Sequence, residues 1–439
     1  MAGAAKERSH IMIITNDNIH TIPQRVTTSP QISLNGFDRN NQRKEYVPSD
    51  RSVALIGCPG CGKSTQIIKM INKLSKNTQA VTVILDIKKE YVQKCFRPGD
   101  VVFSLYNMEG IPEQSQAKWW LLSEAYHDDH PEIVLNEISG MIYKTAVENS
   151  DNRVFPESAR LIFYAILFHI FKSSNGRLPS NKELIKRIAT LPAAEVLDSI
   201  NKYDELVAVR DLITTKQHVT SFGIQMEKAR VLADLFIMNS NYCSDDSNFS
   251  IRNFMHQGRG RRLFIVFDNE SRKSSENMVR LFLDIALKEA CSGDDLLDGD
   301  KRRFYFIMDE YGYLPSGLEY LELSKDQGRS KGIRIFAAFQ TYSQLKKLYG
   351  GREENAMNDT AGYGDIIVFK PHDGGTRDFV VSRCGTEIKK ITTIDVMCNV
   401  HTETKEMPVV PPAVLNSLKR GEAVILPDEG RPFWFHFEE

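Results

Sequence analysis

A glycine-rich stretch early in the chain has the residue types and spacing of a phosphate-binding loop. Residues 57–64 read Gly-Cys-Pro-Gly-Cys-Gly-Lys-Ser and fit the pattern G-x-x-x-x-G-K-[ST]. Glycines let such a loop curl so that its N–H groups point at phosphate oxygens, while the lysine reaches the β- and γ-phosphates and the hydroxyl ligates Mg²⁺. We therefore expect ATP and Mg²⁺ as ligands, with Ser64 on the metal. The predicted nucleotide contacts are Gly57, Gly60, Gly62, Lys63, Ser64 and Thr65.

Two adjacent carboxylates supply the acidic partners that such a loop requires. Asp309 and Glu310 follow the apolar run 304–308, which places them at the carboxyl edge of a predicted strand, where the sites of α/β proteins gather. We expect Asp309 to hold Mg²⁺ through its water shell and Glu310 to polarise the attacking water. Without the phosphate-binding motif, such an acidic pair could equally be an ordinary exposed pair at the end of a strand. The catalytic interpretation therefore depends on that motif.

Alternating strands and helices must position these residues. Apolar runs at 52–56 and 81–85 predict strands, and the apolar spacing within 65–74 predicts a helix between them. Such a βαβ unit with continuous apolar strands is typical of a parallel sheet covered on both faces, so the predicted fold class is α/β. Further strands are predicted at 262–267, 304–308, 333–337 and 365–369, with a helix at 276–290.

A helical region interrupts this pattern between residues 111 and 248, where β-branched runs are few. Its predicted helices are 133–145, 156–171, 182–188, 194–200 and 225–239. We therefore predict a nucleotide-binding domain in two parts, 51–110 and 249–439, with an all-α domain inserted at 111–248. Residues 1–50 are predicted to be an N-terminal arm, either extended or an irregular lead-in, whose opening MAGAAKERSHIM resembles in part a cloning remnant.

Composition narrows the class of protein. The 439 residues suffice for two or three domains, and a net charge of −1 excludes a uniformly basic coat, though not a local DNA-binding surface. Seven scattered cysteines suit a reducing compartment, so the chain is expected in the cytoplasm. The most apolar stretch, 161–171, is about half of the roughly 20 residues needed to span a bilayer, so no membrane crossing is expected.

The cysteine and histidine spacings predict no additional metal or redox site, and the basic groups can be interpreted in two ways. Cys58 and Cys61 form a C-x-x-C inside the loop, where inert small residues are a better interpretation than a zinc or redox site. No histidine spacing suggests a metal other than Mg²⁺. Basic groups that could face a DNA channel, or simply be solvated, are Arg259 with Arg261 and Arg262, Lys301 with Arg302 and Arg303, and Lys389 with Lys390.

Several further motifs occur in a fixed order along the chain. The segments are Asp86-Ile-Lys-Lys-Glu-Tyr91, Phe249-Ser-Ile-Arg-Asn-Phe254, Asp309-Glu-Tyr-Gly-Tyr-Leu-Pro315, Gly328-Arg-Ser-Lys-Gly-Ile333 and Phe339-Gln-Thr-Tyr-Ser-Gln-Leu345. In order and spacing this set resembles the conjugative type IV secretion coupling proteins of the TraG/TraD type over most of residues 50–435. The resemblance implies a RecA-like nucleotide-binding domain interrupted by an all-α domain, assembled as a homo-hexameric ring of DNA-dependent ATPases.

The resemblance also implies roles for residues and partners. Arg329 becomes a finger donated to a neighbour's nucleotide, and Gln340 a sensor of the γ-phosphate. The expected partners are single-stranded DNA, a relaxase or other secretion substrate, and channel proteins at the cytoplasmic face of a bacterial inner membrane. The family carries N-terminal membrane-spanning helices and none precedes residue 50, so membrane association is expected only through a missing segment or a partner.

Two alternatives stay open at this point. A septal or repair-type hexameric DNA translocase would use the same loop and carboxylates, although the inserted helices argue against it. A nucleotide-gated receptor for protein substrates, with little hydrolysis, would use them to stabilise assembly. DNA-stimulated turnover distinguishes the motors from the receptor.

Overall fold

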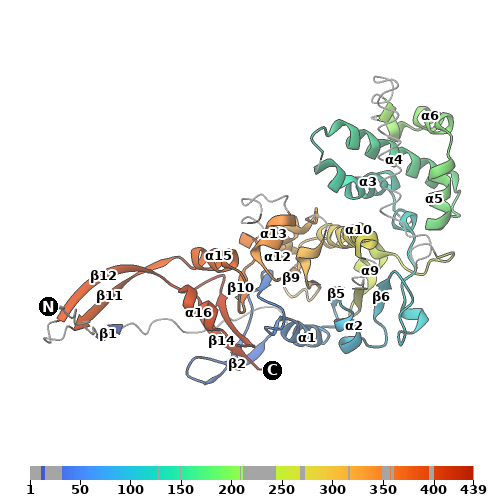
Figure 1. Ribbon diagram of the computed structural model, residues 1–439. Helices are drawn as coiled ribbons and strands as arrows, with labels where there is room; N and C mark the ends of the chain where they lie inside the picture. Colours follow the sequence, from blue (N-terminus) through green and yellow to red (C-terminus); the bar gives the residue numbers. More distant parts are fainter. Residues whose placement is uncertain are drawn as a thin grey trace.

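The computed structural model describes residues 11–14, 32–126, 128–148, 150–207, 209–210, 244–266, 272–314, 317–348, 356, 360–394 and 400–438. Figure 1 shows a central α/β body, a group of helices set apart from it, and a long β-ribbon that projects away from it on the other side. The α/β body is the part that positions the predicted phosphate loop.

The α/β body is built on one eleven-stranded sheet. Its strands are β2 (Leu34–Phe37), β3 (Arg43–Tyr46), β4 (Val53–Ile56), β5 (Ala80–Asp86), β6 (Val101–Ser104), β7 (Arg262–Val266), β8 (Arg303–Met308), β9 (Ile333–Phe339), β10 (Asp365–Val368), β13 (Glu422–Leu426) and β14 (Phe433–Phe437). They lie in the order β3-β2-β14-β13-β10-β4-β9-β8-β5-β7-β6. Strands β10 to β6 are parallel and almost wholly buried, which confirms the predicted α/β class.

The other side of the sheet corrects two expectations. Strands β13, β14, β2 and β3 add to β10 in antiparallel order, so the sheet is mixed rather than parallel. The alternative of an irregular lead-in is wrong for residues 34–37 and 43–46, which form β2 and β3. The sequence of β3 shows no apolar period because Tyr46 is its only buried residue. Aromatic side chains of β14, which lies far along the chain, cover that tyrosine.

Helices cover both faces of the sheet, as parallel strands require. They are α1 (Lys63–Leu74), α2 (Glu90–Cys95), α9 (Ile251–Gln257), α10 (Arg272–Cys291), α11 (Leu321–Asp326), α12 (Gly328–Lys331), α13 (Tyr342–Leu348), α15 (Gly374–Cys384) and α16 (Pro412–Ser417). The apolar side chains of α1 and α2 form one core with the sheet, and those of α9, α10, α11 and α13 form a second core. The helix α1 begins at Lys63, directly after β4 and the glycine-rich loop.

The separate helical body lies between β6 and α9 in the chain (Figure 1). Its helices are α3 (Pro131–Glu148), α4 (Val154–Ser173), α5 (Asn181–Thr190) and α6 (Ala193–Lys202). The helix predicted at 225–239 lies outside the described residues. Within the described part, α4 alone has the length and apolar character of a membrane span, and 56% of its apolar window is buried in the protein. The helix is longer than the apolar stretch 161–171, and it packs as a core helix.

Two chain segments that join the helical body to the sheet are bonded to each other. Trp119, in the segment that follows β6, forms a β-bridge with Phe249, in the segment that precedes α9. The fully buried Glu124 carboxylate accepts hydrogen bonds from the Trp119 indole (2.5 Å) and from the backbone N–H groups of Ile251 (2.8 Å) and Arg252 (3.0 Å). Because a buried carboxylate is costly unless it is hydrogen-bonded, this cluster fixes where the helical body attaches.

The ribbon consists of β11 (Thr386–Ile394) and β12 (Val400–Pro408), with the short strand β1 (Ile11–Ile14) paired to the end of β11. None of these three strands is predicted by the sequence pattern. Polar residues such as Lys389 and Lys390 occur throughout the ribbon, so the apolar alternation that marks a half-buried strand is absent.

Candidate active site

The glycine-rich loop leaves the centre of the sheet with a backbone that only glycine accommodates easily. It follows β4, which lies between β9 and β10. Gly60 and Gly62 have φ angles of 75° and 112°, in the region that favours glycine. A Cβ on Gly57 would lie 2.7 Å from the Cβ of Phe369. The loop therefore keeps a tight curl at the N-terminus of α1, whose first amides have no acceptor within the helix.

Lys63 points back into this curl. Its side chain is 8% exposed, and Nζ donates hydrogen bonds to the carbonyl oxygens of Gly57 (2.5 Å) and Cys58 (3.0 Å). The ammonium group is thus held within the loop, together with the amides at the start of α1. This arrangement fits a nucleotide phosphate, because converging N–H groups and one fixed cation match its oxygens and charge.

Asp309 and Glu310 lie at the same edge of the sheet as the loop. They follow β8, which is separated from β4 by one strand, and both side chains are buried. The hydroxyl of Tyr91 donates to Asp309 Oδ2 (2.5 Å), and Ser64 lies close enough to act on the pKa of that hydroxyl. A single tyrosine therefore lies close to both residues predicted to hold Mg²⁺, although they are far apart in sequence.

The electrostatics of this cluster suit a divalent cation. Burial raises the pKa of Asp309 above its usual range and Glu310 raises it further, whereas the Tyr91 hydrogen bond and the charges of Lys88 and Lys63 oppose the rise. A buried carboxylate with a raised pKa gains from a nearby cation. A hydroxyl and a carboxylate are ligands that Mg²⁺ prefers, so Ser64 and Asp309 fit the ion.

Glu310 is held in an uncommon backbone conformation by two partners. Its φ and ψ are 54° and 35°, the left-handed region that costs a non-glycine residue about 1 kcal/mol or more. Its carboxylate forms an ion pair with Lys88 and accepts a hydrogen bond from Gln340 Nε2 (3.0 Å). Gln340 thus contacts the predicted catalytic carboxylate directly, so the two predicted residues lie in one cluster.

Lys88 and Tyr91 lie in the candidate site, although no sequence pattern predicts a role for either residue. Both lie in the segment 86–91, which was noted only as part of the family resemblance. Asp86 ends β5 and accepts hydrogen bonds from the backbone N–H groups of Glu90 (3.0 Å) and Val92 (2.8 Å), while burial raises its pKa to about 6. It thereby fixes the turn that directs Lys88 and Tyr91 at the acidic pair.

Arg329 does not belong to this cluster. It is exposed on α12, which precedes β9, whereas Gln340 follows the same strand. A seven-residue strand spans roughly 23 Å, so Arg329 lies at the opposite edge of the sheet from the phosphate loop. Its guanidinium is out of reach of the candidate nucleotide site of its own chain.

The two loop cysteines belong to the loop's packing. Cys61 is buried, its sulfur lies 3.9 Å from Lys63 Nζ, and burial raises the pKa of its thiol. Among the described residues no group of three or more His, Cys, Asp or Glu side chains surrounds either sulfur. A raised thiol pKa lowers the fraction of reactive thiolate.

Replacing Tyr91 by Phe should weaken the response to Mg²⁺. The hydroxyl orients Asp309, and loss of such an orienting hydrogen bond typically costs about 10- to 100-fold in metal affinity. We expect the Mg²⁺ concentration that gives half-maximal ATP hydrolysis to rise by about tenfold, with little change in the Kd for ATP without metal. The exposed Tyr106 provides the control, as Tyr106→Phe; an unchanged Mg²⁺ titration for Tyr91→Phe would contradict the orienting role.

Comparisons with known proteins agree with this architecture. The family model described as the type IV secretion-system coupling protein DNA-binding domain matches residues 46–429. A probable conjugal transfer protein TraG of Sinorhizobium fredii is 23% identical over 191 residues, and a conjugal transfer protein TraG of Agrobacterium fabrum is 27% identical over 138 residues. These matches cover 40% and 31% of this chain, but only 29% and 19% of the relatives' lengths.

Solved structures share the fold at low sequence identity. The bacterial conjugative coupling protein TrwBdeltaN70 in its unbound form has a TM-score of 0.73 at 18% identity, covering 89% of this chain and 85% of its own. The plasmid coupling protein TrwB in complex with ADP and Mg²⁺ has a TM-score of 0.68 at 18% identity, with the same coverage. The RecA-type fold with a helical insertion is therefore confirmed.

Proposed function

Because this chain belongs to the type IV secretion-system coupling proteins, whose DNA-binding-domain model matches residues 46–429, we propose that it is an ATP-hydrolysing motor that moves DNA toward a secretion channel. The observation that carries the proposal is that the phosphate loop and the buried carboxylates lie together: the charge of Lys63 acts on the pKa of Asp309, and Tyr91, bonded to Asp309, lies close to Ser64. The ADP and Mg²⁺ bound to the related TrwB support the choice of nucleotide and metal.

Each residue of the cluster has a task in this proposal. Lys63 and the first amides of α1 bind the phosphates of ATP, and Ser64 and Asp309 hold Mg²⁺, which when bound neutralises charge on the phosphate oxygens. Glu310 accepts a proton from the attacking water. Gln340 bonds to Glu310 and thereby couples the presence of the γ-phosphate to the end of β9.

The proposed partners follow from family membership. Single-stranded DNA is the proposed nucleic acid, and a relaxase or another secretion substrate and the channel proteins are the proposed protein partners. A homo-hexameric ring is proposed because Arg329 lies at the opposite edge of the sheet and can serve only a neighbour's site. We place the ring at the cytoplasmic face of a bacterial inner membrane. Membership of the coupling proteins favours this function over a septal or repair-type translocase.

Steady-state phosphate release with and without single-stranded DNA tests the motor. We expect DNA to stimulate release in the parent protein and Lys63→Ala to reduce it by about 10²- to 10³-fold, because a fixed charge aimed at the transferred phosphoryl group is lost. Lys94, exposed and paired with Glu90 on α2, provides the control as Lys94→Ala. Nucleotide binding without DNA-responsive turnover, in protein whose ring assembly has been verified, would instead support the receptor.

A further inference from the structure

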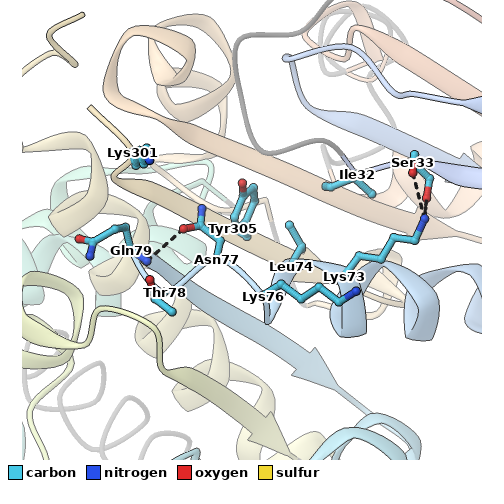
Figure 2. A pocket seen from close by; sticks show the side chains of 10 residues that line it. All are labelled: Ile32, Ser33, Lys73, Leu74, Lys76, Asn77, Thr78, Gln79, Lys301 and Tyr305. Atoms are coloured by element: carbon cyan, nitrogen blue, oxygen red, sulfur yellow. Dashed lines mark hydrogen bonds between the residues drawn. The ribbon is translucent and has the colours of Figure 1, made fainter. Parts of the chain in front are cut away.

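A pocket of about 460 Å³ lies at the edge of the sheet opposite the phosphate loop. Figure 2 shows its walls: the C-terminal end of α1, the turn that leads into β5, the start of β8, and the residues before β2. Helix α1 has twelve residues and is about 18 Å long, so the pocket and Lys63 lie at opposite ends of one helix. The pocket is therefore a separate site from the candidate active site.

The side chains around the pocket are positively charged. Lys73, Lys76 and Lys301 line it, and no Asp or Glu is among the lining residues. Lys73 donates to the carbonyl and hydroxyl oxygens of Ser33, whereas Lys76 and Lys301 are exposed. The carboxylate next to Lys301 in sequence, Asp300, accepts a hydrogen bond from the backbone N–H of Arg302 (2.7 Å). The local field thus attracts anions although the whole chain is nearly neutral.

Two buried polar groups at the pocket add hydrogen-bond donors. The Tyr305 side chain is 0% exposed, and Asn77 lies close enough to lower the pKa of its hydroxyl. Neither Tyr305 Oη nor Asn77 Nδ2 has a hydrogen-bond partner of ordinary geometry among the described residues. Asn77 Oδ1 is already used, because it accepts from the backbone N–H of Gln79 (3.0 Å). Because the two groups lie against each other without a hydrogen bond of good geometry, their donor capacity is not fully used, and a bound acceptor would stabilise this arrangement.

The geometry points to a second phosphate-binding site, which takes one nucleoside phosphate. Ammonium, amide and hydroxyl groups all donate, which matches a phosphate ester. The volume exceeds that of a lone phosphate, and the apolar side chains of Ile32 and Leu74 suit the nucleoside. Such a unit can come from a single strand of DNA or from a free nucleotide. The DNA source rests on the proposed function, whereas the free-nucleotide source does not.

Charge reversal tests the DNA source. With a labelled oligothymidine and anisotropy at several salt concentrations, Lys76→Glu/Lys301→Glu should bind at least about tenfold more weakly than the parent and lower the salt slope by about 1.4, or 0.7 per lost contact. Lys182→Glu/Lys186→Glu on α5 makes the same change in net charge elsewhere. An equal loss in that control would overturn the site, because total charge would then explain the effect.

A less disruptive variant tests the pocket itself. Asn77→Asp keeps the acceptor for the Gln79 N–H but adds a negative charge, so it should also weaken binding while leaving nucleotide binding at the phosphate loop unchanged. For the free-nucleotide source, fluorescent ADP is titrated into Lys63→Ala protein with and without Lys76→Glu/Lys301→Glu. If Lys63→Ala protein still binds fluorescent ADP and Lys76→Glu/Lys301→Glu abolishes that binding, the free-nucleotide source is supported.

The outcomes separate this site from the proposed function. Parent protein that binds no single-stranded DNA contradicts the motor, and the fluorescent ADP titration then decides the pocket. If Lys76→Glu/Lys301→Glu and Asn77→Asp bind DNA as tightly as the parent, and Lys76→Glu/Lys301→Glu does not change the binding of fluorescent ADP, the second phosphate-binding site is contradicted. The proposed motor function is not affected by that result.

Discussion

Replacing Glu310 by Gln should leave ATP bound and nearly stop its hydrolysis. Gln retains the size of the side chain and can still bond to Gln340, which contacts Glu310 Oε2 at 3.0 Å. It cannot accept the proton of the attacking water, and loss of such a general base typically costs about 10²- to 10⁴-fold in rate. Single-turnover phosphate release measures the chemical step, and equilibrium binding of a fluorescent ATP analogue measures affinity.

The interpretation of Glu310→Gln depends on the affinity for the ATP analogue as much as on the rate of phosphate release. Glu310→Gln also removes the ion pair with Lys88, so the thermal stability of the variant must be compared with that of the parent. Glu322, exposed on α11, gives the matched control as Glu322→Gln. A rate within about threefold of the parent, at unchanged affinity, would show that Glu310 is not the base, since a general base contributes at least about 10²-fold.

Arg329→Ala should abolish ATP hydrolysis, because each Arg329 is expected to act on the nucleotide site of the neighbouring subunit. An arginine finger is worth about 10³- to 10⁵-fold in phosphoryl transfer. Because Arg329 and Gln340 lie at opposite ends of β9, the arginine can act only on the site of another chain. Arg329→Ala protein should therefore hydrolyse almost no ATP while it still binds the nucleotide. Lys331→Ala on the same helix serves as control, since Lys331 bonds to the Gly293 carbonyl at the sheet edge.

Mixing two inactive proteins tests the direction of this contact. Rings assembled from Arg329→Ala and Lys63→Ala subunits contain sites in which an intact Lys63 faces an intact Arg329 of the neighbour. At equal amounts and random mixing, about a quarter of the sites should be complete, so activity should reappear to about that fraction. If the arginine acted within its own chain, no site would be complete and the mixture would stay inactive.

Local sequence determined the residue types of the candidate nucleotide site. The loop 57–64, the strand before it and the helix after it are continuous in sequence, so their glycine positions and apolar spacing predict both structure and ligand. Asp309 and Glu310 were predictable for the same reason, since an apolar strand that ends in carboxylates marks the active edge of an α/β sheet. The helices of the insertion were also visible as local apolar patterns, and the described ones formed close to their predicted bounds.

Tertiary structure decided which of these groups meet. The contacts of Tyr91 with Asp309 and of Lys88 with Glu310 join residues more than two hundred positions apart, and no periodicity encodes such a pairing. The antiparallel strands β2 and β3 escaped prediction because each has only four residues, and the buried Tyr46 of β3 is covered by β14. Arg329 was identified by motif, but only the strand order showed that it lies away from its own site. Periodicity and turn residues act over a few positions, whereas strand order depends on burial summed over the whole chain.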